Sequence, residues 1–208
     1  AHEYLSQLQC EAGNIEEGIA RARLAAALEP SLLQALGHVA RVYALRRDLE
    51  AWNQFMARLE NQPHFQFMAL IARIRVAGWF GDLDTVRQVL ERARTVALGE
   101  RESAVTFTGR TLLGEVGSAE ILAQVERMLG GGTSPRLYTS TCQVTAELLC
   151  IRGFHEEALA MVERAGDARL IDREWLGFCP ALAAIREDPR LPKGRRTVSQ
   201  RVETMWIV

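Results

Sequence analysis

The chain has 208 residues, of which 48% are hydrophobic and 25% are charged, and these are ordinary values for a globular protein. Its formal net charge of −1 excludes a global basic field, so the sequence predicts neither a nucleic-acid-binding protein nor one held at a membrane surface. It contains no apolar run near the roughly 20 residues that span a bilayer, and no signal pattern is visible.

Two features of the composition indicate where the protein works. The four cysteines, Cys10, Cys142, Cys150 and Cys179, form no CxxC pair and no framework spacing, which predicts free, buried thiols in a reducing cytosol. Lys193 is the only lysine and arginine supplies the other 24 basic residues, a bias typical of a GC-rich bacterial genome. We therefore expect a cytoplasmic bacterial protein, and because the chain begins with Ala rather than Met we expect a fragment of a longer one.

A short turn followed by a helix recurs along the chain. The first copy lies in EAGNIEEGIARARLAAALEP, residues 11–30, where Gly13 precedes the helix and Pro30 ends it. In that helix the small residues Gly18 and Ala25 stand seven apart. The frame returns after two steps of 34 residues and, more loosely, after two steps of 36, with turns predicted at Arg47-Asp48, Gly81-Asp82, Gly117-Ser118 and Gly153-Phe154.

The helices ahead of these turns keep the same frame. Five residues before each turn every copy has an aliphatic residue: Leu8, Val42, Val76, Leu112 and Leu148. A period near 34 with a helix on each side of a short turn indicates a helical-hairpin repeat, and no strand-like alternation competes with it. The pattern predicts an all-α fold with helices near 2–12, 15–29, 32–46, 48–60, 64–80, 83–98, 101–115, 118–129, 135–152 and 155–165.

These residue types resemble the tetratricopeptide repeat, in which small residues let neighbouring helices approach closely and a proline closes each unit. The resemblance covers about residues 1–166, and it implies five tetratricopeptide-like helix pairs stacked into a solenoid, a right-handed superhelix. Arg47 stands where a turn glycine is usual, and Trp52 stands where a small residue is usual. The breaker stretch GGGTSP, residues 130–135, is the predicted hinge between the fourth and fifth pairs.

Residues 167–208 are predicted to be capping helices that cover the apolar end of the stack. Asp172 is suited to cap a short helix that contains Trp175, because its carboxylate can accept the free N–H groups of the first turn. Pro180 is suited to open the next helix, which an Asp-Pro step then stops. A final amphipathic helix is expected at 196–206.

The same C-terminal stretch also resembles the end of tetratricopeptide regions in large bacterial regulators. Those regions follow serine/threonine kinase, nucleotide-cyclase or ATPase portions, none of which is present in this chain. The resembling residues are Asp172, Trp175, Cys179-Pro180, Leu182, Arg186, Asp188-Pro189 and Trp206. The resemblance implies a regulatory role in signalling and carries no catalytic activity over to this chain.

The sequence offers no constellation for catalysis, for a metal or for a cofactor. Its histidines, His2, His38, His64 and His155, are scattered over separate helices or turns, and no nucleophile-elbow, phosphate-loop or dinucleotide-binding motif occurs. Acidic pairs such as Glu16-Glu17 fall in predicted first turns, where they favour the helix dipole. We therefore expect a protein that is not an enzyme.

A candidate peptide-binding groove follows from the repeat frame. The resemblance implies that the first helix of each pair lines a concave surface, and six residues before the predicted turns stand Gln7, Arg41, Arg75 and Thr111, with Glu147 in the fifth copy. Arg41 and Arg75 should then lie next to one another, where two guanidiniums could hold the carboxylates of an acidic segment. The alternative is that each arginine merely pairs with a neighbouring Glu or stays solvated.

Two functions of different classes stay open. The first is a protein- or peptide-binding scaffold, a regulatory module of a bacterial signalling protein. The second is a small-molecule sensor or hydrolase that uses the solenoid groove as a pocket. An open groove lined by arginine and apolar side chains would favour the first, and a closed cavity with perturbed ionisable groups would favour the second.

Overall fold

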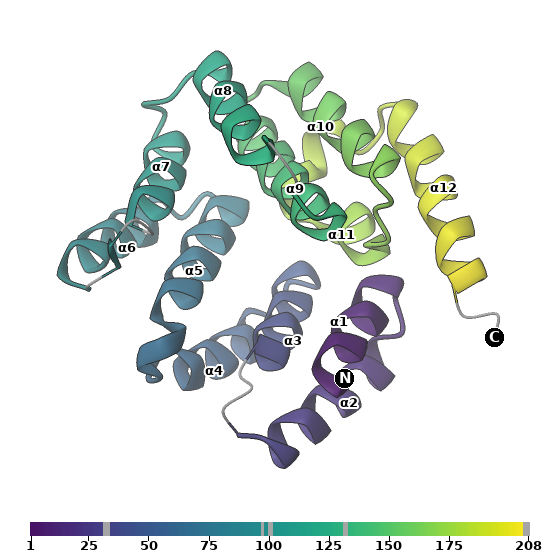
Figure 1. Ribbon diagram of the computed structural model, residues 1–208. Helices are drawn as coiled ribbons and strands as arrows, with labels where there is room; N and C mark the ends of the chain where they lie inside the picture. The colour runs from purple at the N-terminus through teal and green to yellow at the C-terminus, as the bar shows by residue number, and fades with distance from the viewer. Residues whose placement is uncertain (31–33, 97, 100–101, 131–132, 206–208) are drawn as a thin grey trace. The chain divides into compact units, whose positions relative to one another are not determined.

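The computed structural model describes residues 1–30, 34–96, 98–99, 102–130 and 133–205, and within these ranges it contains helices and turns but no strand (Figure 1). The all-α prediction is confirmed, and none of the helices in these ranges is long and apolar enough to cross a membrane. In chain order the elements are α1 (His2–Ala12), α2 (Ile15–Leu28), α3 (Gln34–Leu45), α4 (Leu49–Glu60), η1 (Pro63–Phe65), α5 (Gln66–Phe80), α6 (Leu83–Thr95), α7 (Glu102–Leu112), α8 (Ser118–Leu129), α9 (Pro135–Ile151), α10 (His155–Asp167), α11 (Arg173–Phe178), η3 (Pro180–Ile185) and α12 (Arg190–Met205).

The predicted helices agree with the observed ones to within a few residues, and the differences have local causes. Helix α6 ends at Thr95 rather than near 98 because Val96 is already extended, with φ −97° and ψ 134°. The final helix begins at Arg190 rather than at 196, and the Asp188 carboxylate accepts the backbone N–H of its first residue at 2.9 Å. Predicted helical positions 32–33, 97, 101 and 206, and residues 131–132 of the predicted hinge, lie outside the described residues.

One backbone motif ends the first helix of each of the five pairs, and in four of them it lies at the predicted turn. A residue in the left-handed region follows the helix, with φ values of 93° at Gly13, 64° at Arg47, 71° at Gly81, 91° at Gly114 and 80° at Gly153. The N–H of the next residue then donates to the carbonyl five positions back, at 2.8 or 2.9 Å in all five cases. This is the Schellman arrangement, which satisfies carbonyls that the helix end would leave unpaired.

The spacing of this motif follows the repeat frame for three copies and then departs from it. Gly13, Arg47 and Gly81 are 34 residues apart, as predicted. The fourth left-handed residue is Gly114, three positions before the predicted turn at Gly117, so α7 ends at Leu112 and a longer connection leads to α8. Arg47 adopts the glycine conformation at the one turn where the sequence has no glycine.

Small residues allow close approach between neighbouring helices, as the sequence pattern predicts. A Cβ added to Gly18 of α2 would lie 2.5 Å from the Cys10 Sγ atom of α1, and one added to Gly109 of α7 would lie 2.5 Å from Leu90 of α6. Neither contact is possible for a larger residue without a shift of the neighbour. These glycines therefore fix the distance between paired helices.

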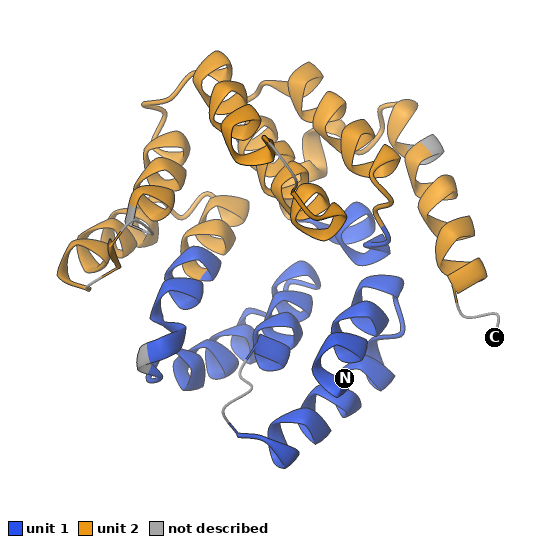
Figure 2. Cartoon of the chain, viewed as in Figure 1, with its two compact units in different colours: residues 1–72, 171–179 blue, residues 73–170, 180–208 orange. Residues whose placement is uncertain are grey.

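The chain forms two compact units, which Figure 2 distinguishes by colour. Unit 1 consists of Ala1–Ala72 together with Ile171–Cys179. In it α1 packs against α2 and α3, α3 also packs against α4, and α11 packs against α1 and α3. Small and aliphatic side chains form part of its core, namely Ala22, Ala25, Ala35 and Val39, with Ile19, Tyr43 and Phe55 packed against them.

Unit 2 consists of Arg73–Leu170 and Pro180–Val208. In it α9 packs against α7, α8 and α10, while α6 packs against α7. The 3-10 helix η3 contacts α9 and α10, and α12 packs against α10. The division into repeats at 1–166 and a cap at 167–208 stays a prediction.

The C-terminal stretch forms the local structures predicted for it with two differences, one of which is the early start of α12 at Arg190. Asp172 is the N-cap of α11, and its Oδ1 accepts the backbone N–H of Trp175 at 2.9 Å. Trp175 and Cys179 are fully buried. Pro180 opens a 3-10 helix where we expected an α-helix. Ile171–Cys179 belongs to the unit of the N-terminal helices, whereas the residues on both sides of it belong to unit 2.

Candidate functional site

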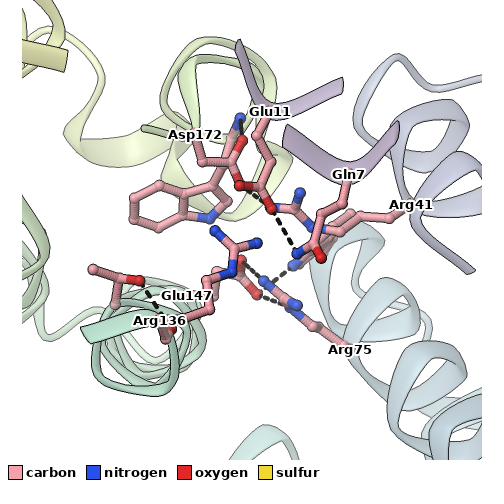
Figure 3. Close-up of polar contacts among 10 residues, drawn as sticks. Gln7, Glu11, Arg41, Arg75, Arg136, Glu147 and Asp172 are labelled. Atoms are coloured by element: carbon pink, nitrogen blue, oxygen red, sulfur yellow. Dashed lines mark hydrogen bonds and ion pairs between the residues drawn. The ribbon is translucent and has the colours of Figure 1, made fainter. Parts of the chain in front are cut away.

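Arg41 lies on α3, six residues before the left-handed residue Arg47, and it binds a carboxylate in unit 1. Its Nη2 atom donates to Oδ2 of Asp172 at 2.8 Å, and the Asp172 side chain is only 2% exposed (Figure 3). The other oxygen of that carboxylate accepts the backbone N–H of Trp175. One aspartate therefore caps α11 and fixes that helix to α3 through an arginine.

Arg46, the residue directly after the end of α3 at Leu45, makes a second set of contacts with helix α11. Its Nε and Nη2 atoms both lie 2.7 Å from Oε2 of Glu174, whose side chain is 6% exposed. Its guanidinium also stacks on the Phe178 ring, with the guanidinium carbon 3.8 Å from the ring centroid. This distance is within the range of a favourable cation–π interaction. Arg41 of α3 and Arg46, the residue directly after that helix, thus hold two carboxylates and an aromatic ring of the 171–179 segment.

Arg75 binds a carboxylate within unit 2. Its Nε and Nη2 atoms donate to the two oxygens of Glu147, each at 2.6 Å, in the bidentate arrangement that suits a guanidinium (Figure 3). The indole N–H of Trp79 donates to the same carboxylate at 2.8 Å. Because the Glu147 side chain is 1% exposed, three hydrogen bonds replace the water that this charge loses on burial.

Arg75 and Glu147 stand at the same position of their own repeats. Each lies six residues before a left-handed turn residue, Gly81 for one and Gly153 for the other. Positions in the third and fifth copies therefore meet directly in a salt bridge. Arg75 pairs with a Glu, as in the alternative given for the arginines, whereas the partner of Arg41 is an Asp that is 131 residues away in sequence.

The other two predicted groove residues differ in their surroundings. Gln7 lies on α1 and donates to Oε1 of Glu11 one turn further on, at 3.0 Å. Thr111 is fully buried, and its hydroxyl donates to the Phe107 carbonyl within α7. It lies three rather than six residues before its left-handed residue, Gly114, which explains why it turns toward the core. The predicted proximity of Arg41 and Arg75 stays a prediction, because the two residues belong to different units.

The four cysteines, Cys10, Cys142, Cys150 and Cys179, are free and buried. Burial raises the pKa of the Cys10 thiol to about 12, with a smaller contribution from Glu11. Burial also raises the pKa of Cys142 and of Cys150. Among the described residues no group of three His, Cys, Asp or Glu side chains could hold a metal ion.

Sequence reasoning missed the residues that complete these contacts. Arg46 and Glu174 carried no signal, because they are 128 residues apart in sequence and each is an ordinary charged residue of a helix. Asp172 was recognised as a helix cap, and its second partner, Arg41, lies 131 residues away. Glu147 did carry a signal, since it shares the repeat position of Arg75 with opposite charge.

Comparison of the chain with models of known protein families, with curated proteins and with solved structures gives no match. The resemblance to the tetratricopeptide repeat therefore rests on the sequence pattern.

Proposed function

We propose that this chain is a non-catalytic protein-binding module, a tetratricopeptide-like solenoid that holds acidic peptide segments within a cytoplasmic bacterial signalling protein. The observation that supports this most is the presentation of its arginines. Arg41 and Arg75 stand at one repeat position and each holds a carboxylate, at 2.8 and 2.6 Å. A planar guanidinium on a packed helix recognises a carboxylate with defined geometry, which a flexible surface lysine does not.

The groups that the arginines bind indicate the chemical class of the partner. The groups that the arginines hold here are side-chain carboxylates of the chain itself, so a partner with Asp or Glu side chains offers the same ligand. The Arg41 and Arg46 side chains keep 18% and 43% of their exposure, and an acidic segment can approach them from solvent. Unit 1 is therefore the part of the chain where we place the contact.

A binding measurement with a matched control tests this function. The probe is a library of short, fluorescently labelled peptides rich in Asp and Glu, and the readout is fluorescence anisotropy. We expect the Arg41→Gln, Arg46→Gln variant to bind about tenfold or more weakly than the wild type, because charged hydrogen bonds of unit 1 are lost.

The control variant is Arg87→Gln, Arg94→Gln, which removes the same net charge from exposed ion pairs of α6. It should bind as the wild type does, apart from weak long-range attraction. Circular dichroism and thermal melting establish that each variant is folded. Equal affinity in all three proteins would remove both arginines from the binding site and with them the basis of the proposal.

A further inference from the structure

The segment of residues 171–179 lies on α1 and α3 as a bound peptide would. It contacts arginines that are 128 and 131 residues away in sequence, and it belongs to unit 1 although the residues before and after it belong to unit 2. Helix α11, which it contains, packs against both α1 and α3. The 171–179 segment is thus a short piece of chain inserted among helices that are distant from it in sequence.

The contacts of this segment have a distinct chemistry. Asp172 at the N-cap binds Arg41, and Glu174 two residues later binds Arg46. Both acidic residues stand at the N-terminal end of α11, where the helix dipole favours negative charge. Gly13 lies next to the Glu174 carboxylate: a Cβ atom added to Gly13 would lie 3.6 Å from Oε1 of Glu174.

Apolar side chains of the segment anchor it beside these ion pairs. Trp175 and Cys179 are 0% exposed and Leu176 is 1% exposed, whereas Phe178 is 42% exposed and lies under the Arg46 guanidinium. Buried aromatic anchors flanked by charge contacts are typical of peptide recognition by protein surfaces. The segment combines shape, charge and an aromatic anchor within nine residues.

We propose that the surface of α1 and α3 is a binding site for a short acidic helix, that the 171–179 segment is its built-in occupant, and that a partner segment of the same chemistry replaces it. That chemistry is an Asp cap, a Glu two residues later and a Trp directly after it. This proposal rests on the proposed function and names its partner class and its regulation. The module binds its partner only in the fraction of molecules in which the 171–179 segment has left the surface.

Tethering makes the built-in occupant a strong competitor. A segment joined to its site by the same chain acts at an effective concentration in the millimolar range, so a free partner binds the wild type weakly. The apparent affinity is the intrinsic affinity multiplied by the open fraction. Substitutions that weaken the contacts of the 171–179 segment with α1 and α3 should therefore strengthen the binding of a partner.

A peptide of residues 170–180, fluorescently labelled, provides the probe. We expect it to bind the full chain carrying Asp172→Asn and Glu174→Gln about tenfold or more tightly than it binds the wild type. Adding Arg41→Gln and Arg46→Gln to that variant should abolish the gain. The charge-matched control, Glu126→Gln with Glu156→Gln, removes two carboxylates that pair with arginines elsewhere, and it should show no gain.

Two further measurements make the result decisive. If Asp172→Asn, Glu174→Gln does not fold, the pair Glu174→Gln, Phe178→Ala, which loses only the contacts of Arg46, is tested in the same way. In the wild type, amide hydrogen exchange should be faster in the 171–179 segment than in α9 and α10, because a displaceable segment opens locally. Exchange of the segment only through global unfolding would overturn the proposal.

Equal affinity of the peptide for wild type and variant, or a gain that does not depend on Arg41 and Arg46, would also overturn it. These failures are separable from failure of the proposed function. Acidic peptides that bind the wild type through Arg41 and Arg46, while the 170–180 peptide fails to bind any variant, would leave the proposed function intact and remove the built-in occupant.

Discussion

Arg75 and Glu147, each six residues before the left-handed residue that ends its helix, bind one another through two hydrogen bonds of 2.6 Å. The Trp79 indole completes the site, and the carboxylate is almost fully buried. Glu147→Gln keeps the shape of the side chain and removes its charge. We expect it to lower the free energy of unfolding by about 3–5 kcal/mol, because the guanidinium then loses its counter-ion in a largely buried place.

The double variant Arg75→Met, Glu147→Met should cost less than this single change, since no charge is then left without its partner. It leaves the Trp79 N–H without an acceptor, which costs about 1–3 kcal/mol. Urea unfolding of the wild type, of Arg75→Met, of Glu147→Met and of the double variant gives the coupling free energy between the two residues. Additive effects would show that the ion pair does not act as a unit.

Arg47 has a φ of 64° where the equivalent turns have glycine. A non-glycine residue in this left-handed region costs about 1–2 kcal/mol of folding free energy. Glycine avoids this cost, but its larger conformational entropy in the unfolded chain offsets about 0.5–1 kcal/mol of the gain. Arg47→Gly should therefore raise the free energy of unfolding by about 1 kcal/mol. The reverse change at Gly81, where an added Cβ would meet nothing within 4 Å, isolates the same backbone effect. Gly81→Ala should lower the free energy of unfolding by a similar amount. Melting temperatures of Arg47→Gly and Gly81→Ala that both rise or both fall relative to the wild type would contradict this account.

Trp175 and Phe178 lie three residues apart on α11 and differ in burial, at 0% and 42% exposed. Truncation of a fully buried aromatic costs about 3–5 kcal/mol, so Trp175→Ala should be strongly destabilising. Phe178→Ala loses mainly the contact with Arg46, which is worth about 0.5–1 kcal/mol at an exposed site. Chemical denaturation followed by circular dichroism measures both. A harmless Trp175→Ala would mean that α11 does not support the fold of unit 1.

The thiols should respond to pH in a direction set by burial. The pKa of Cys10 is raised to about 12 from its ordinary value of 9, so the folded protein keeps this proton at pH values where the unfolded chain has lost it. The stability contributed by the neutral, buried thiol is full below pH 9 and is lost as the pH rises through about 12. Reaction with a thiol reagent at pH 9 should be slow in the native state and fast in denaturant. Rapid native-state labelling of Cys10, located by mass spectrometry, would contradict the burial argument.

The helices could be predicted because their signals are local. The left-handed glycines at 13, 81 and 153, the aspartate caps at 48, 82 and 172 and the recurring aliphatic positions each act within a few residues of themselves. Gly114 shows the limit of the pattern. Three glycine and serine positions within 114–118 compete for one turn, and the packing of Leu112 against Gly78 accompanies the earlier end of α7.

The candidate site was less predictable because its contacts join distant parts of the chain. Arg41 and Arg75 were identified as arginines at one repeat position, and both hold carboxylates. Their partners, Asp172 and Glu147, are chosen by how the helices pack, which no local pattern encodes. The repeat frame predicted only the position that Arg41 and Arg75 share.

The insertion of the 171–179 segment into unit 1 has a consequence for how the protein is made. A ribosome adds about 5–20 residues per second, so roughly 5–20 s pass between the synthesis of residue 72 and that of residue 179. During that time the nascent N-terminal helices lack Trp175, and Arg41 and Arg46 lack their carboxylates. Unit 1 therefore acquires its last element only after residues 73–170 of unit 2 have been made, and translation that stops early releases a polypeptide whose first helices lack that element.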